Sequence, residues 1–351
     1  MELMKKSYLN FIVKCIAVSG IAFLLLLLLN YRYKQVMDDP YADAHKFDFM
    51  NSTYNNIQIA NIGSSHGEYA FYYEELTKQS GYECFNFAMA SQTYNYDLAI
   101  LSMYREHFAK DSILFIPISY FSFNDEVVNE TERESLNAKY YTFLSPRYIP
   151  GYSPYIDLVT HRMPILSAGE DIVKLFPSNI LYSFMPLKAF AAESSVLSPE
   201  ELKKETEAQF YEKALNRYQR HMENKEEYFM QERIDNLYDI IDFCMKNGIT
   251  PVLITTPYTS YYTDMVSAEF KTEFYDTIHA ITAATSVPYY DYSQDERFTS
   301  HLEYFADADH LDTGGAIAFM NIIKEEIPEY REFLQNNDPI HNGDPNWQPP
   351  Y

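Results

Sequence analysis

Short apolar runs alternate with segments of helical periodicity along most of the chain. Five apolar runs have the length and the β-branched or aromatic content of buried strands, and they lie at 57–62, 84–88, 113–118, 250–255 and 287–290. Helical patterns lie between and after these runs, at 67–79, 92–109, 228–246, 264–284 and 313–326. Strands that alternate with helices form parallel sheets covered on both faces. We therefore predict an α/β fold, a three-layer sandwich around a mainly parallel five-stranded sheet, within a domain at 56–330.

The alternation is interrupted at about 121–227. This stretch is rich in Tyr, Pro and charged residues. One helix is predicted in it, beginning at Ser198, because Ser caps helices and Pro199 then occupies the first helical position. We predict an insertion between the third and fourth strands, with a separate small domain as the alternative. The turn-rich stretch at 331–351 is predicted to be an irregular tail.

The N-terminal segment at 11–29 is apolar except for Lys14. About 20 such residues in a helix cross a hydrocarbon core of about 30 Å, and the long stem of a lysine near the end can reach the headgroups. A cleaved signal peptide is the alternative, but it needs small residues after the apolar run, where this chain continues with the sequence NYRYK. We therefore predict an uncleaved transmembrane anchor at 1–30, followed by a stalk at 31–55.

The basic residues around this segment give a slight orientation signal. Three lysines precede or enter the apolar run, and Arg32 and Lys34 follow it, so the positive-inside bias only slightly favours a cytoplasmic N-terminus. No later segment is long and apolar enough to span a membrane. The prediction is a single-pass protein of the cytoplasmic membrane, with its catalytic domain outside the cytoplasm.

The acidic composition limits the classes of partner. A formal charge of -23 argues against nucleic acid, since binding there depends on Lys and Arg that neutralise phosphates, and it disfavours a broad docking face for anionic lipid. Cys15 lies in the apolar N-terminal run, and Cys84 and Cys244 are interpreted as small buried hydrophobes. Cys and His do not occur at metal-ligand spacing, so we predict neither a metal nor another cofactor.

The run Gly63-Ser64-Ser65 follows the first predicted strand and precedes a helix. A serine at such a turn is exposed at the carboxyl edge of the sheet, and its hydroxyl and amide lie in the positive field of a helix N-terminus. This placement suits a nucleophile and an oxyanion donor. The alternative is that the serines cap the helix and the glycine makes the turn.

A second chemically suggestive run, FADADHLDTGG, follows the last predicted strand. In it Asp307 precedes His310 by three residues, so its carboxylate can orient the imidazole while the other ring nitrogen acts as a general base. We expect Asp309 and Asp312 to be solvated loop acids. An acidic loop with a solvated histidine is the alternative for the whole run.

A nucleophile after the first strand and a D-x-x-H run after the last resemble SGNH (GDSL-type) hydrolases, whose fold is flavodoxin-like. The family's first block, G-D-S, is matched with Ser64 in place of the aspartate, and the resemblance implies that Ser65 is the nucleophile and His310 and Asp307 complete a triad. Its second block, N-x-G-x-x-G-x-T, is similar to the run NFAMASQT, with Ser91 at the position of the oxyanion-hole glycine.

The third block of that family, G-x-N-D, lacks a clear match. Asn124 lies a few residues beyond the third strand without the glycine, and it is the predicted third oxyanion donor beside the Ser65 and Ser91 amides. The predicted substrate-binding residues lie next to the other blocks or at the end of the fourth strand, and they are His66, Gln92, Thr256 and Tyr258.

The apolar N-terminus, the G-[ST]-S run and the closing D-x-x-H-L are similar to a membrane-anchored branch, the teichoic acid D-alanyl transfer and alginate O-acetylation proteins. This resemblance implies a bacterial cell-envelope serine esterase or acyltransferase that uses an acyl-enzyme. It implies as partners a cell-surface glycopolymer or acylated carrier and a multi-spanning membrane O-acyltransferase. The alternatives are a carbohydrate O-deacetylase that uses water, and a non-catalytic envelope binding or assembly protein. The weak third block and the serine replacements favour the last alternative.

Overall fold

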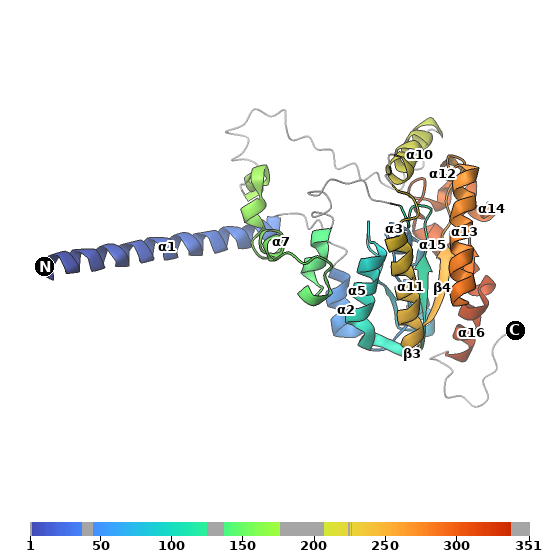
Figure 1. The fold of residues 1–351 in the computed structure, drawn as a ribbon, viewed down its shortest axis with the longest axis horizontal. Coiled ribbons are helices and arrows are strands. Elements are labelled where there is room, and N and C mark those ends of the chain that lie inside the picture. The colour runs from blue at the N-terminus through green and yellow to red at the C-terminus, as the bar shows by residue number, and fades with distance from the viewer. Residues whose placement is uncertain are drawn as a thin grey trace. The chain divides into compact units, whose positions relative to one another are not determined.

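A five-stranded parallel sheet forms the centre of the fold (Figure 1). The computed structural model describes residues 2–36, 45–124, 137–175, 207–223, 225 and 227–337. The strand order is β2-β1-β3-β4-β5, and every neighbouring pair is parallel. The strands are β1 (Ile57–Asn61), β2 (Cys84–Asn86), β3 (Phe108–Pro117), β4 (Thr250–Thr255) and β5 (Tyr289–Asp291). The predicted α/β fold with a parallel five-stranded sheet is confirmed.

Helices cover both faces of this sheet. On one face α11 (Gln231–Lys246) packs on β4 and lies between α5 (Tyr94–Tyr104) and α13 (Ala268–Thr285). On the other face α3 (Ser65–Ala70) and α16 (Pro328–Asn336) pack on β3, and α15 (Thr313–Glu326) lies against both of them. The crossover connections that parallel strands require are therefore supplied by helices on both sides.

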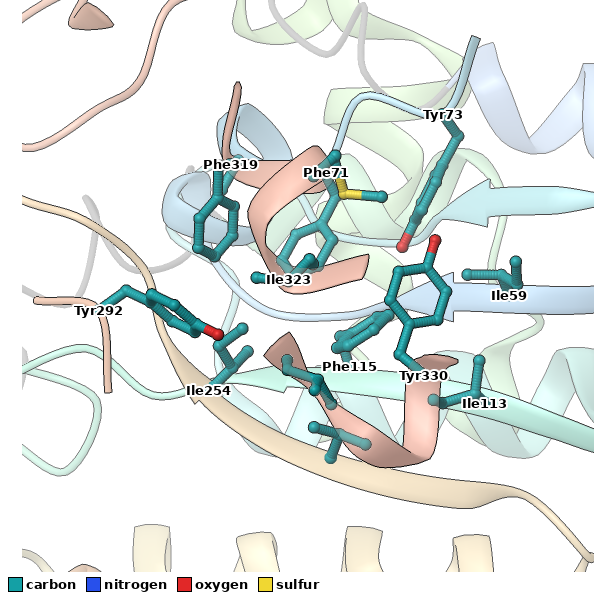
Figure 2. Close-up of a cluster of buried hydrophobic side chains, with 14 of the residues drawn as sticks. Ile59, Phe71, Tyr73, Ile113, Phe115, Ile254, Tyr292, Phe319, Ile323 and Tyr330 are labelled. Atoms are coloured by element: carbon teal, nitrogen blue, oxygen red, sulfur yellow. The ribbon is translucent and has the colours of Figure 1, made fainter. Parts of the chain in front are cut away.

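The core on the α15 side is largely aromatic (Figure 2). Phe319 of α15 packs edge-to-face against Phe71, with ring centroids 6.0 Å apart, and Phe71 in turn lies 5.2 Å from Phe115 of β3. Tyr330 of α16 meets Phe115 at 5.0 Å and nearly at right angles. The two edge-to-face pairs, Phe71–Phe319 and Phe115–Tyr330, have a favoured aromatic geometry. Burial of these rings holds α15 and α16 against the sheet and so fixes the loop that leads into α15.

The helix predicted at 67–79 is two helices, α3 and α4 (Glu74–Ser80). Between them Phe71 and Tyr73 turn into the core, and a continuous helix could not bury both rings there. Asn86 of β2 stabilises the break, because its Nδ2 lies 3.1 Å from each of the carbonyl oxygens of Gly67, Glu68 and Phe71. These are the carbonyls that a helix end leaves without partners.

Two other boundary predictions are wrong in part. The stretch predicted as a stalk is largely helical, because α1 (Glu2–Val36) continues into it and α2 (His45–Thr53) follows. The tail begins as helix, since α16 extends to Asn336 and buries Tyr330 and Phe333 in the core. The helix predicted to begin at Ser198 lies outside the described residues.

The chain divides into two compact units. The smaller comprises 1–44, 134–143 and 151–195, and the larger contains the sheet. The stretch predicted as one insertion contributes to both units, since it also supplies α10 (Glu207–Met222) to the larger one. The other short helices are η2 (Arg105–His107), η3 (Ala138–Thr142), η4 (Pro146–Tyr148), α7 (Pro154–Ile156), η5 (Asp157–Arg162), η6 (Pro164–Ser167), η7 (Gly169–Leu175), α12 (Ser260–Thr263), α14 (Glu296–Thr299) and η8 (Leu302–Tyr304).

The smaller unit contains the apolar N-terminal helix. Within α1, the 27-residue stretch Tyr8–Lys34 contains an 18-residue window with a mean hydropathy of 2.7 and is long and apolar enough to cross a membrane. Cys15 on this helix is exposed, whereas Cys84 and Cys244 of the larger unit are buried free thiols, as predicted.

Gly315 provides a test of the packing that fixes α15. A Cβ there would lie 2.1 Å from the carbonyl oxygen of Tyr304, which accepts a hydrogen bond from the Asp312 amide. We expect Gly315→Ala to lower the free energy of unfolding by about 1–3 kcal/mol, because a backbone carbonyl must move. The measurement is urea unfolding of the detergent-solubilised protein. Gly314→Ala is the control, since its Cβ would meet only a carboxylate oxygen at 3.3 Å. Equal losses in both variants would contradict the argument.

Candidate active site

Ser65 is held at the carboxyl end of β1 by a turn that requires glycine. Gly63 has φ of +110°, which L side chains rarely adopt, and a Cβ there would contact the ring of Pro117 at 3.5 Å. The chain then enters α3 with Ser65 as its first helical residue and Ser64 as its N-cap. Ser64 makes no side-chain capping bond, so the structure does not support a capping role for its hydroxyl. Ser65 is half-buried.

The three residues predicted as a triad are brought together. His310 Nε2 lies 2.7 Å from Ser65 Oγ, and His310 Nδ1 lies 2.8 Å from Asp307 Oδ2. The serine and the histidine are 245 residues apart in the chain. In this geometry Nδ1–H donates to the carboxylate, so Nε2 is free to accept the serine proton. The arrangement can activate a hydroxyl as a nucleophile.

The loop that carries His310 is fixed by its own backbone bonds. Asp307 Oδ1 accepts from the amides of His310 at 2.9 Å and Asp309 at 3.1 Å, so this carboxylate shapes the turn as well as the ring orientation. Phe305 and Leu311 pair as an antiparallel bridge at the base of the loop. Thr259, which follows β4, donates to the Ala308 carbonyl through both its amide and its hydroxyl. The imidazole is therefore held in place before any substrate binds.

Asp309 is buried, and the expectation that it is a solvated loop acid is wrong. Only 1% of its surface is exposed. Arg217 of α10 donates to both of its oxygens, from Nε at 2.8 Å and from Nη2 at 3.0 Å, and His66 Nε2 lies 3.0 Å from Oδ2. Such a pairing compensates the cost of burying a charge. Asp312, half-buried, caps α15 through the Gly315 amide at 2.7 Å.

Arg217 and Tyr69 enclose the imidazole of His310. Arg217 Nη2 lies 3.1 Å from Nε2 and 3.3 Å from Nδ1. The in-plane positions of both nitrogens are taken by Ser65 and Asp307, so a donor nearly equidistant from both must lie over the face of the ring. The ring of Tyr69, on α3, lies 4.8 Å from that of His310 at 31°. A guanidinium and a phenol therefore lie beside the imidazole that contacts Ser65.

The predicted substrate-binding residues His66, Gln92 and Tyr258 have partners inside the protein. Ser119 Oγ and Tyr258 Oη lie 2.8 Å and 3.1 Å from His66 Nδ1. Gln92 donates to the Phe87 carbonyl and to Asp97. All three side chains are buried, so their placement does not support contact with substrate. Thr256 is also buried, immediately after β4.

The predicted oxyanion residues differ in their placement. Ser91 is half-buried and has φ of +56°, the left-handed conformation that favours glycine, so it adopts the backbone for which the resemblance expects a glycine. Within the described part of the chain, neither the Ser65 amide nor the Ser91 amide donates to a protein acceptor. Asn124 is buried, and its Nδ2 donates to the His221 carbonyl at 3.3 Å, so this group is directed to α10.

Asp97 of α5 connects the two loops that carry Ser65 and Ser91. Its Oδ1 accepts from the Gly63 amide at 2.8 Å and from Gln92 Nε2 at 2.6 Å. The carboxylate is fully buried. This oxygen therefore joins the β1–α3 turn to the loop after β2, in addition to the direct bond from the Met89 amide to the Gly63 carbonyl at 3.1 Å.

Sequence reasoning missed Tyr69, Asp97, Arg217 and His221. Two weak signals were present. Tyr69 lies four residues after Ser65 on one helix, and Arg217 and His221 are four residues apart on another, spacings that place each pair on a common face. His221 stacks on Phe121 with ring centroids 4.0 Å apart, and its Nδ1 lies 3.0 Å from Tyr262 Oη. No local pattern indicates that α10 would pack beside the D-x-x-H loop.

Burial and charge shift the titration of three groups in this cluster. Burial lowers the pKa of His66 despite the adjacent Asp309 carboxylate, and burial lowers the pKa of His221 further still. Burial alone would raise the pKa of Asp309, but the hydrogen bond from His66 and the neighbouring histidines hold it well below its usual range. At neutral pH the cluster therefore combines an anionic Asp309, a cationic Arg217 and uncharged His66 and His221.

His66, Asp309 and His310 also place ligand atoms within 4.8 Å of one another, which raises the question of a metal. The donor set does not fit one. Arg217 donates to both Asp309 oxygens, and a bound cation would have to displace or repel this guanidinium. His310 Nε2 is already directed at Ser65. We assign no metal to this cluster.

No protein-family profile and no curated protein matches this chain. Among solved structures, it is similar to a candidate platelet activating factor from Streptococcus pneumonia, with 13% identity, a TM-score of 0.38, and coverage of 88% of this chain and 98% of that one. A candidate acylhydrolase from Bacteroides fragilis has 11% identity and a TM-score of 0.38, with coverage of 85% and 100%. A GDSL-like lipase from Bacteroides thetaiotaomicron has 10% identity, a TM-score of 0.37 and the same coverage. At these values the likeness carries no argument about activity, which rests on the geometry above.

From the two buried histidines, we predict that the free energy of unfolding depends on pH. Unfolding exposes His66 and His221, which then bind protons near the ordinary value of about 6.5, whereas the folded state leaves them neutral. The free energy of unfolding should therefore be highest above pH 6.5 and fall as the pH drops toward 5, by up to about 1.4 kcal/mol per pH unit for each histidine. Urea titrations at several pH values measure this slope.

His221→Phe should flatten that slope. The phenyl ring can keep the stacking on Phe121, while the titrating group is lost. A constant offset from the lost Tyr262 contact does not affect the slope. His279→Gln, at an exposed position of α13, is the matched control and should leave the slope unchanged. An unaltered slope in His221→Phe would show that this histidine does not cause the acid sensitivity.

Proposed function

We propose that this chain is a membrane-anchored serine esterase or acyltransferase of the SGNH type that acts on acyl esters through an acyl-enzyme. The observation that carries the proposal is the continuous hydrogen-bonded path from Asp307 through His310 to Ser65. A non-catalytic protein that merely kept the fold would have no need to hold a serine hydroxyl 2.7 Å from a histidine whose other nitrogen is already paired.

In the proposed mechanism, His310 Nε2 takes the proton of Ser65 as its Oγ attacks the ester carbonyl. The tetrahedral intermediate then collapses, the bond to the leaving alcohol breaks, and His310 returns the proton to that alcohol. Asp307 holds the ring and stabilises its cation. In the second half-reaction, a hydroxyl of a polymer or a water molecule gives its proton to His310 and attacks the acyl-enzyme. The new tetrahedral intermediate collapses, the bond between the acyl carbon and Ser65 Oγ breaks, and His310 returns the proton to Ser65.

The Ser65 and Ser91 amides are the proposed oxyanion donors. Preorganised donors of this kind stabilise the developing charge without reorganising during the reaction. The left-handed backbone of Ser91 supports its role, because strained conformations persist where function or packing demands them. Asp97 acts as a positioning residue, since its one oxygen ties both loops together. We propose no role for Asn124, whose amide group is used by α10.

Residues 11–29 are the proposed anchor, with the larger unit outside the cytoplasm. The proposed substrates are acetyl or similar esters of a cell-surface polysaccharide or teichoic acid, and the proposed partner is a multi-spanning membrane O-acyltransferase. The apolar length of α1 supports the anchor, and the resemblance of the sequence blocks supports the substrate class and the partner.

Hydrolysis is the second candidate function, with water as the acceptor in a carbohydrate O-deacetylase. Solvent access favours it, because Ser65 is half-buried and 31% of the Asp307 side chain is exposed. Acetate release, compared with transfer to a sugar acceptor in the same assay, separates the two reactions.

Ser65 rather than Ser64 should react with a fluorophosphonate probe. The full-length protein in detergent should be labelled, and Ser65→Ala should not be. Ser64→Ala should retain labelling, because it is the Ser65 hydroxyl that His310 contacts. His310→Ala should also suppress labelling, since an unassisted serine hydroxyl is a weak nucleophile. Labels are located by mass spectrometry of the modified peptide. Undiminished labelling of Ser65→Ala would exclude Ser65 as the nucleophile.

Replacement of the two loop carboxylates should have different effects on activity and stability. Asp307→Asn should lower kcat by about 10⁴-fold with the fold retained, because the imidazole is no longer oriented correctly and its cation is no longer stabilised by a carboxylate. Asp309→Asn should instead lower the free energy of unfolding, by roughly 3 kcal/mol, because Arg217 loses its carboxylate. Steady-state kinetics and urea unfolding of both variants measure this. The opposite assignment, with Asp307→Asn unstable and Asp309→Asn stable but inactive, would contradict it.

A further inference from the structure

The smaller unit holds a run of short helices against the end of the apolar helix. Asn30, the first polar residue after the apolar stretch, donates from Nδ2 to the Arg162 carbonyl at 2.9 Å and accepts from the Ile165 amide at 3.3 Å. Tyr33, one turn later, packs with Ile165 and Ala168. Asn30 and Tyr33 are the buried residues of α1 among those whose side chains are described. The segment from α7 to η7 is therefore attached to α1 just where its apolar stretch ends.

This position corresponds to the lipid headgroup region if α1 crosses a membrane. A helix rises about 1.5 Å per residue, so Tyr33 lies about 6 Å beyond Leu29. The headgroup layer outside a hydrocarbon core of about 30 Å is about 5–8 Å thick on each side. Anything packed against Asn30 and Tyr33 therefore lies at the level of the headgroups.

The same segment exposes large apolar side chains. Tyr155 is 71% exposed, Leu158 41%, Leu166 51% and Ile172 43%. Tyr155 lies in α7, and Leu158 lies in the adjoining η5. Single exposed apolar side chains are common on soluble surfaces, so these four gain significance from their position beside the end of the apolar helix.

Polar groups suited to headgroups lie within this segment and at the adjoining end of α1. The Arg162 side chain is 66% exposed, although its Nε also pairs with the Asp157 carboxylate at 2.8 Å. Arg32 and Lys34 are exposed on α1, and Tyr31 beside them is 64% exposed. Tyrosines and cations at the end of a span are typical membrane-interface anchors.

We propose that the segment Pro154–Leu175 is an interfacial platform that lies in the headgroup region of the leaflet from which α1 emerges. Its apolar side chains enter the boundary with the acyl chains, as in helices that lie in the membrane plane. The inference rests on the proposed anchor, whose continuity with the platform through Asn30 and Tyr33 identifies the bilayer as the occupant of this surface. The platform interacts chiefly through apolar burial, so it does not require anionic lipid.

The test uses tryptophan fluorescence of the full-length protein in phosphatidylcholine nanodiscs. The only native tryptophan, Trp347, is first replaced by Phe. Leu166→Trp then reports the platform and Phe23→Trp reports the span, both at exposed positions. Tyr211→Trp on α10, also exposed, is the matched control in the larger unit. Lipids brominated close to the headgroup, or close to the end of the acyl chain, quench a tryptophan at their own depth.

Leu166→Trp should lose emission with headgroup-proximal bromine more than with chain-end bromine, and Phe23→Trp should show the reverse. The quenching of Leu166→Trp should exceed that of Tyr211→Trp, a site that the proposal does not assign to lipid. If Phe23→Trp is quenched and Leu166→Trp is not, the platform is excluded while the anchor stands. If Phe23→Trp is not quenched either, the anchor itself fails. Blue-shifted but unquenched emission of Leu166→Trp would mean that protein covers this surface, which would also overturn the proposal. Ile172→Trp repeats the test should Leu166→Trp fold poorly, and Ser65 labelling reports the catalytic proposal separately.

Discussion

A carboxylate with 1% exposure cannot be solvated by water, and the candidate site depends on how the protein satisfies Asp309. Its two oxygens are bonded by Arg217 from α10 and by His66 from α3. These contacts join three segments that are far apart in the chain, and Asp309 itself immediately precedes His310. Because an unpaired buried charge costs several kcal/mol, the ion pair holds α10 in place beside the imidazole. The geometry of Ser65 and His310 is therefore supported by a carboxylate that touches neither of them through hydrogen bonds.

Asp307 and Asp309 have different roles in the loop, because one pairs with the imidazole of His310 and the other with the guanidinium of Arg217. Asp307 faces the ring edge, remains partly exposed, and can stabilise an imidazolium that forms and disappears in each proposed cycle. Asp309 is committed to a permanent cation, Arg217, and its low pKa keeps it charged throughout the neutral range. The guanidinium over the face of His310 is thereby compensated by a fixed negative charge. Without that charge, Arg217 would oppose the formation of a cation on the same ring.

The sequence predicted those features that are encoded locally and missed those that arise from packing between distant segments. All five strands and the pairing of Asp307 with His310 follow from apolar runs and an i to i+3 spacing, and the structure has both. The break between α3 and α4 was missed because it depends on which aromatic rings enter the core. Arg217 and Asp309 are 92 residues apart in the chain, and Arg217 belongs to the stretch without a regular pattern. No periodic pattern therefore predicts their contact. Asp309 looked solvated because its partner could not be identified.

Ser91 shows that the backbone conformation of such a site can be kept when the residue type changes. The resemblance led us to expect a glycine there, and a side chain in place of it suggested a degraded site. The backbone nevertheless adopts φ of +56°, at some cost in strain for a residue with a Cβ. Asp97 holds the neighbouring Gln92 and the Gly63 amide through a single buried oxygen, which helps to impose this loop conformation. What the proposed oxyanion hole needs is the direction of an N–H group. The surrounding hydrogen bonds can fix that direction, so the residue type alone does not decide whether the site is competent.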